Sequence, residues 1–154
     1  MAEAEDFFTR LGRILQKGDQ ILTGFDLRKD PKVILEAYND PSGITREFNL
    51  NLLRRMNREL DADFDTDAFY HYPVYDPLDG AARSYLISRR QQEVNIKAVP
   101  MIVKFDEAEP VFMEISQKYS LDDINGFAEK SGFRQIRNFF DSRNYFTNSL
   151  WEKL

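Results

Sequence analysis

The sequence has no cysteine and a single histidine, His71, among its 154 residues. Without cysteine it can form no disulfide framework, thiol nucleophile or cysteine-based metal site. One histidine argues against a multi-histidine zinc site and against a Ser-His-Asp triad with a spare base. The 7 glycines are scattered, so neither GxGxxG nor a P-loop exists. We therefore expect no metal site, no catalytic residue and no visible nucleotide-type cofactor site in this chain.

Long hydrophobic runs are also absent, and charge of one sign does not accumulate. No apolar run approaches the ~20 residues that span a bilayer. Basic and acidic residues are interleaved at a net charge of −5, which gives no basic stripe for nucleic acid. The opening residues are acidic, unlike the start of a signal peptide. We expect no membrane, no nucleic-acid partner and a cytoplasmic location.

What is present is the composition of about one globular domain, with 42% hydrophobic residues and 13 phenylalanines to pack its core. The first third predicts helices and one strand. A helical pattern over residues 7–15 precedes Gly18, and residues 20–27 have the largely apolar pattern of a buried parallel strand. Asp30 and Pro31 predict the start of a helix over residues 32–39. Thr45 is expected to cap a second helix. Its predicted apolar stripe is Phe48, Leu52, Leu53, Met56 and Leu60.

The middle third changes to a period of two. Residues 70–76 and 83–90 predict a hairpin, and residues 93–96, 101–105 and 111–118 predict further strands, so this block is expected to be mainly antiparallel. Ser120 with Asp123 then predicts a helix start, and residues 133–140 and 145–151 predict two last strands. The fold class predicted is α/β with an α+β insertion.

Two features invite a functional interpretation and do not support one. Alternating carboxylates over residues 61–67 are similar to a calcium loop, but Thr66 replaces the required glycine and Tyr72 the final glutamate. A solvated turn and helix cap is the preferred interpretation. His71 is interpreted as a packing or hydrogen-bonding residue, because a single histidine on a strand usually has that role.

Four residues are candidates for ligand binding. Glu114 and Ser116 alternate with apolar residues, so both should point from one face of a strand, where a carboxylate and a hydroxyl could bind a small nitrogenous ligand. An ordinary strand with a hydrated polar face explains the same pattern. Tyr38, at the end of a short helix, and Tyr85, within the hairpin, could equally reach into a cleft or pack half-buried.

Several short blocks, taken in order, resemble those of one enzyme family. They are residues 24–30 (GFDLRKD), 37–40 (AYND), 43–45 (GIT), 48–53 (FNLNLL), 57–60 (NREL), 62–65 (ADFD), 68–71 (AFYH) and 114–119 (EISQKY). The chain thus resembles, from about residue 7 to its end, the S-adenosylmethionine-dependent, histidine-specific methyltransferases. These include the ergothioneine-pathway enzymes that methylate the α-amino group of L-histidine.

The resemblance implies the C-terminal part of a class I methyltransferase Rossmann-like sheet. Residues 1–30 and 120–154 would form part of that sheet, with residues 21–26 as its fifth strand, and residues 31–119 would be a substrate-binding insertion. Tyr38 then matches a tyrosine that contacts histidine, and Glu114 and Ser116 match the pair that recognises imidazole. Tyr85 falls where some members place a pocket methionine. The cofactor would be S-adenosylmethionine, but the family's binding site for it lies in a half that has no counterpart here.

The leading hypothesis is therefore the substrate-recognising, C-terminal part of an L-histidine Nα-methyltransferase-like protein, inactive alone. Two alternatives remain: methylation of a different small amine, and a non-catalytic amino-acid-binding or oligomerisation module. A sheet cut beside residues 21–26 would expose a strand edge, and such edges pair with other chains. We expect a homo-oligomer, or association with a missing N-terminal half.

Overall fold

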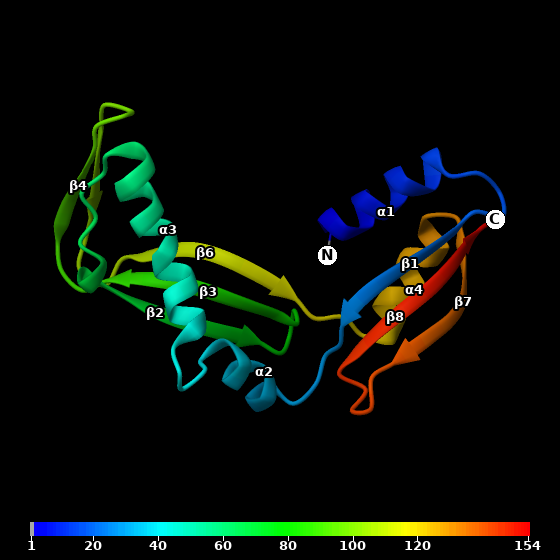
Figure 1. The fold of residues 1–154 in the computed structure, drawn as a ribbon. Helices are drawn as coiled ribbons and strands as arrows, with labels where there is room; N and C mark the ends of the chain where they lie inside the picture. The colour runs from blue at the N-terminus through cyan, green and yellow to red at the C-terminus, as the bar shows by residue number, and fades with distance from the viewer. Residues whose placement is uncertain (1) are drawn as a thin grey trace. The chain divides into compact units, whose positions relative to one another are not determined.

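The computed structural model describes residues 2–154, and they form two compact units. The first unit combines the residues up to Lys29 with Gln117–Leu154, and the second is Asp30–Ser116. Each unit has its own hydrophobic core. The fold is mixed α/β with antiparallel sheets, as the sequence predicts (Figure 1).

The first unit is a three-stranded sheet with two helices. Its elements are α1 (Ala2–Ile14), β1 (Gln20–Asp26), α4 (Leu121–Lys130), β7 (Phe133–Phe140) and β8 (Phe146–Lys153). The strand order is β1-β8-β7, and both pairs are antiparallel. The expectation that residues 20–27 form a buried parallel strand is wrong: β1 lies at a sheet edge among the described residues, and Leu22 is 62% exposed. The apolar run covers one face of an edge strand, not both faces of a central one.

Aromatic rings fill the core of this unit. Trp151 is fully buried, and its ring packs against Phe8, Phe25 and Phe133 with centroid separations of 4.8–5.9 Å. The helix start predicted at Ser120 is confirmed, because Ser120 and Asp123 exchange the two hydrogen bonds of a capping box. Phe127 on α4 packs its ring against Phe8, with centroids 5.9 Å apart, so α4 is part of this core.

The second unit has two antiparallel sheets. Its helices are α2 (Pro31–Tyr38), α3 (Ile44–Leu60) and the 3₁₀ turn η1 (Thr66–Ala68), and its strands are β2 (Phe69–Asp76), β3 (Ala81–Ser88), β4 (Gln92–Ile96), β5 (Met101–Phe105) and β6 (Pro110–Gln117). One sheet has the order β2-β3-β6, and β4 pairs with β5. The predicted 70–76 and 83–90 hairpin is confirmed, since β2 and β3 pair from Phe69↔Ser88 to Asp76↔Ala81.

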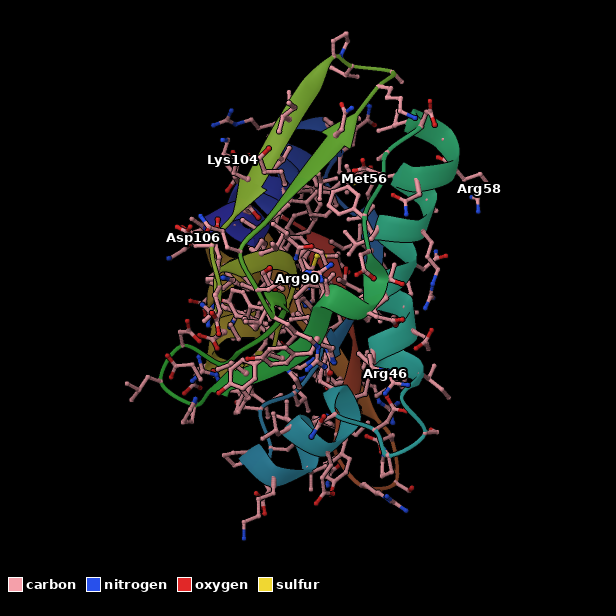
Figure 2. The ribbon with its side chains drawn as sticks, turned by 90° about the vertical axis from the view of Figure 1, so that its left-hand side faces the viewer. Arg46, Met56, Arg58, Arg90, Lys104 and Asp106 are labelled. Carbon is pink, nitrogen blue, oxygen red and sulfur yellow. The ribbon has the colours of Figure 1, made fainter. Side chains whose placement is uncertain are left out.

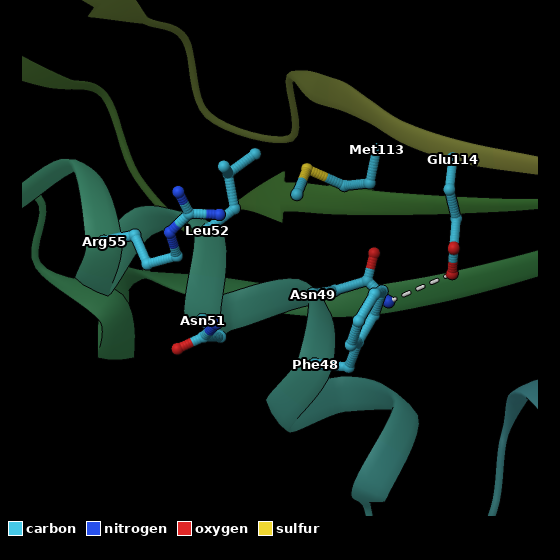
Figure 3. A pocket seen from close by; sticks show the side chains of 7 residues that line it. All are labelled: Phe48, Asn49, Asn51, Leu52, Arg55, Met113 and Glu114. Atoms are coloured by element: carbon cyan, nitrogen blue, oxygen red, sulfur yellow. Dashed lines mark hydrogen bonds between the residues drawn. The ribbon is translucent and has the colours of Figure 1, made fainter.

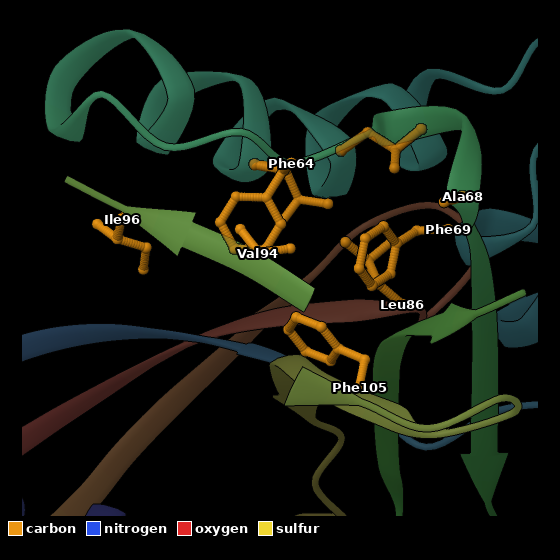
Figure 4. Close-up of a cluster of buried hydrophobic side chains, with 9 residues drawn as sticks. Phe64, Ala68, Phe69, Leu86, Val94, Ile96 and Phe105 are labelled. Carbon is orange, nitrogen blue, oxygen red and sulfur yellow. The ribbon is translucent and has the colours of Figure 1, made fainter. Parts of the chain in front are cut away.

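The core of the second unit lies between α3 and these strands. Phe64, Phe69 and Phe105 form its centre, with ring centroids 5.4–6.2 Å apart (Figure 4). Met56 on α3 packs against this cluster, whereas Arg58 lies on the outer side of the helix (Figure 2). The acidic run before β2 is a turn with a cap, as expected, because the Asp65 carboxylate accepts from the Asp67 N–H at the start of η1.

The two helix starts in this unit differ from each other. Asp30 caps α2 by accepting from the Lys32 N–H, and Pro31 follows it, as predicted. The prediction that Thr45 caps α3 is wrong. Gly43 is the N-cap residue, with φ of 71°, and the Asp40 carboxylate accepts from the backbone N–H groups of Ile44 and Thr45. A carboxylate three residues before Gly43 satisfies backbone donors at the start of α3 that a threonine cap would otherwise have to satisfy.

The buried face of α3 is also rotated from the predicted one. Phe48 and Leu52 are 67% and 45% exposed, whereas Asn49, Leu50 and Leu53 are buried. The predicted stripe is therefore wrong in its first turns and correct from Leu53 onward. This shift puts a polar residue, Asn49, on the inner face.

Candidate functional site

Glu114 lines a pocket of about 200 Å³ between α3 and β6 (Figure 3). The other lining residues are Phe48, Asn49, Asn51, Leu52, Arg55 and Met113. Glu114 itself is half-buried, and its Oε1 lies 3.5 Å from the Asn49 Nδ2. The pocket thus combines the Glu114 carboxylate with the apolar side chains of Phe48, Leu52 and Met113 and with the polar side chains of Asn49, Asn51 and Arg55. The apolar side chains and the carboxylate suit a small flat ligand with a polar N–H group.

Tyr38 lines a second, more polar pocket of about 290 Å³. Its other lining residues are Asn39, Asp40, Pro41, Gly43, Arg46, Tyr70, His71 and Arg89. Hydrogen bonds from Thr45, Ile44 and Ser42 hold the pKa of the Asp40 carboxyl well below its usual range, so it stays ionised. The Arg89 guanidinium lies over the Tyr70 ring, 4.9 Å from its centroid. This pocket therefore carries charges of both signs beside the Tyr38 phenol.

His71 lies on β2 beside both groups of residues. It lines the Tyr38 pocket, and its Nε2 is 3.2 Å from the Ser84 Oγ. Burial lowers the pKa of His71, while the negative charges of Glu114 and Asp40 act in the opposite direction. The neutral form is thus favoured at pH 7. The interpretation of His71 as a hydrogen-bonding residue fits this contact.

The structure does not bring the four predicted residues into one pocket. Glu114 and Tyr38 line different pockets. Tyr85 on β3 packs its ring against Phe112 at 5.9 Å, and neither pocket is lined by it. Ser116 is half-buried two residues beyond Glu114 on β6 and lines neither pocket. The binding roles of all four remain predictions.

Asn49 is the residue that sequence reasoning missed. It is 2% exposed and touches the one carboxylate of the Glu114 pocket. A signal was available: Asn49 lies four residues before Leu53 and four after Thr45, so a helix that buries Leu53 also buries the Asn49 amide. The predicted apolar stripe started at Phe48 because of its large apolar side chain, and the buried face starts one residue later, at Asn49.

The described residues do not fit the site of a nucleoside-containing cofactor such as S-adenosylmethionine. In a Rossmann-like sheet such a ligand lies at the carboxyl ends of parallel strands, where a glycine-containing loop approaches it. The strands β1, β8 and β7 pair only antiparallel with one another. The described strands of this unit therefore provide no such edge for S-adenosylmethionine.

The described residues also lack the side-chain groupings and helices that metal and membrane sites need. Between Ala2 and Leu154 no group of three or more His, Asp or Glu side chains is placed to hold a metal ion. Over that range, too, none of the helices has the length and apolar character needed to span a bilayer.

Comparison with known proteins identifies the family. The sequence model described as "Histidine-specific methyltransferase, SAM-dependent" matches residues 1–153. The chain therefore belongs to the histidine-specific methyltransferase family, and its resemblance to that family is confirmed.

Individual relatives agree with the family match. The chain is 35% identical over 147 residues to the histidine N-alpha-methyltransferase of Mycobacterium tuberculosis, a match that covers 96% of this chain and 46% of the relative. It is 35% identical to the enzyme of the same name from Mycolicibacterium smegmatis, with 97% and 46% covered. Ergothioneine biosynthesis protein 1 of Schizosaccharomyces pombe is 28% identical, with 88% and 18% covered. The chain thus spans about half the length of the bacterial relatives.

Proposed function

We propose that this chain is the substrate-recognising, C-terminal portion of an L-histidine Nα-methyltransferase-like protein. The observation that carries the proposal is the placement of Glu114, a half-buried carboxylate facing a pocket whose walls include Phe48, Leu52 and Met113. An imidazole ring can pack against such apolar walls and donate its N–H to the carboxylate. An amino acid without that donor would leave the charge unpaired, which costs binding free energy.

The other predicted residues complete the proposal. Ser116 would assist Glu114 at the ring, Tyr38 would contact the amino-acid part of the substrate, and Tyr85 would line the binding region. The chain would depend on S-adenosylmethionine bound elsewhere and would have little activity alone. We also propose a cytoplasmic location, and association with a second copy or with an N-terminal half.

A non-catalytic binding or oligomerisation module is the second candidate. The observation that favours it is the edge position of β1, whose only pairing partner among the described strands is β8. Such a module would use that edge and need no ligand at Glu114.

Calorimetric titration of the chain with L-histidine separates these proposals. We expect saturable binding by the wild-type chain and a loss of at least about tenfold in affinity for Glu114→Gln, which keeps the size but not the charge of the side chain. Glu107→Gln is the control, because it makes the same charge change in an exposed turn. Equal affinity for all three proteins, or no binding at all, would contradict histidine recognition through Glu114.

A further inference from the structure

Asn49 is a buried amide on the inner face of a helix whose neighbouring inward positions are aliphatic. Its exposed fraction is 2%, and Leu50 and Leu53 beside it belong to the core of the second unit. A buried amide costs free energy unless hydrogen bonds satisfy it. Leucine has the same branching and the same number of side-chain heavy atoms and would suit packing alone. The amide group of Asn49 therefore requires an explanation from its polar contacts.

The contacts of Asn49 are directional. Its Nδ2 lies 2.9 Å from the Thr45 carbonyl oxygen, one helical turn back, and 3.5 Å from the Glu114 Oε1 on β6. The first contact fixes which end of the amide is nitrogen, because only an N–H can donate to a carbonyl. The second N–H is then directed at the carboxylate across the pocket, as the dashed line in Figure 3 shows.

The contact between Asn49 and Glu114 can affect ligand binding, because it lies at the pocket that Glu114 lines. Asn49 and Glu114 line the same pocket, so a ligand there meets a carboxylate whose position depends on α3. A donor that is neutral holds the carboxylate in place without cancelling its charge, whereas a lysine or arginine would form an ion pair with it. A carboxylate has about four acceptor sites, so Glu114 can accept from Asn49 and still accept from a ligand.

We infer that Asn49 is a positioning residue that holds the Glu114 carboxylate toward the pocket and so helps to select a ligand with an N–H donor. The inference rests on the proposed function for the identity of that ligand, L-histidine. Asn49 acts through Glu114 and does not itself take part in any reaction.

Two nearly isosteric variants of the full chain test the inference by histidine titration. Asn49→Leu removes the donor, and its affinity for L-histidine should fall about fivefold. Asn49→Asp replaces the donor with a second carboxyl beside Glu114. Its loss relative to Asn49→Leu should be large at pH 8 and should shrink toward pH 5.5, as the introduced carboxyl takes up a proton and can donate. Because the imidazole of L-histidine takes up a proton over the same pH range, each variant is compared with wild type at the same pH. Affinities of both variants within twofold of wild type at pH 8 overturn the inference.

A measurement without ligand keeps the inference independent of the proposed function. In the side-chain amide NMR spectrum, Glu114→Gln should shift the Asn49 Nδ2 protons upfield and speed their exchange with water, although Asn49 itself is unchanged. Unchanged Asn49 signals would overturn the inference even if histidine binds. Binding by Asn49→Leu within twofold of wild type, with binding lost in Glu114→Gln, would overturn it and leave the proposed function standing. Binding retained in Glu114→Gln would remove the proposed function, and the amide signals would then decide the positioning role alone.

Discussion

At the scale of single residues, three polar side chains of the second unit line the two candidate pockets. Glu114, Asn49 and His71 come from β6, α3 and β2, and each is buried or half-buried. Glu114 was predicted as a candidate because it alternates with apolar residues along its strand, and the family resemblance then implied its role at the imidazole. Asn49 was not, because its role depends on which face of α3 is buried, and tertiary packing decides that.

His71 makes stability depend on pH near neutrality. Its pKa is lowered in the folded chain, chiefly by burial, so below the ordinary value of 6.5 the unfolded chain binds more protons than the folded one. The free energy of unfolding should therefore fall as pH drops from 6.5 toward the folded pKa. His71→Gln should remove this loss, and since the chain has one histidine, no other imidazole can replace it.

Urea unfolding at pH 7.5 and pH 5.5 checks this prediction. The wild-type chain should lose more stability between the two values than His71→Gln does. The same pH dependence in both proteins would show that burial does not hold His71 neutral.

At the scale of elements, most helices and strands follow from local patterns. The hairpin of β2 and β3, the Asp30 cap and the Ser120 capping box are all set by short-range chemistry and were predicted. The start of α3 was not, because Asp40 reaches across the break to Ile44 and Thr45. The antiparallel setting of β1 was also missed, because its apolar pattern does not reveal how many neighbours it has.

The contact of α1 with the end of α4 gives a prediction at this scale. A Cβ atom at Gly12 would lie 2.2 Å from the Ser131 carbonyl oxygen, so the helices approach too closely for a side chain. We expect Gly12→Ala to destabilise the chain by about 2 kcal/mol, despite the better helix propensity of alanine.

Gly126→Ala in α4 is the matched control. A Cβ there meets no atom within 4 Å, so this change should stabilise the chain by up to about 1 kcal/mol. Thermal unfolding of both variants measures the difference. Two variants of equal stability would show that the close approach at Gly12 carries no cost.

At the scale of the whole molecule, β1 has an edge without a described partner strand. Unpaired strand edges favour pairing with another chain. We predict that the chain sediments at micromolar concentration as a dimer. Leu22→Lys, at a residue that is 62% exposed on β1, should shift it toward monomer, because charged side chains on an edge strand oppose pairing. A wild-type chain that sediments as a monomer would contradict this prediction.

The family of the whole chain was predictable from ordered short blocks, and the match to residues 1–153 confirms it. The arrangement of the candidate site was less predictable from the sequence. Spacing along β6 places Glu114 and Ser116 on one strand, but only the fold shows that Tyr38 and Glu114 line different pockets. The number of residues between α2, α3 and β6 in the sequence does not predict which of their side chains line the same pocket.

The central claim is that Glu114 makes this chain selective for an imidazole-bearing amino acid. The most direct test is to titrate the wild-type chain with L-histidine and with L-phenylalanine under the same conditions and compare the two affinities. We predict saturable binding of L-histidine and at least about tenfold weaker binding of L-phenylalanine, which has no ring N–H to donate. Equal affinity for the two amino acids would contradict the claim.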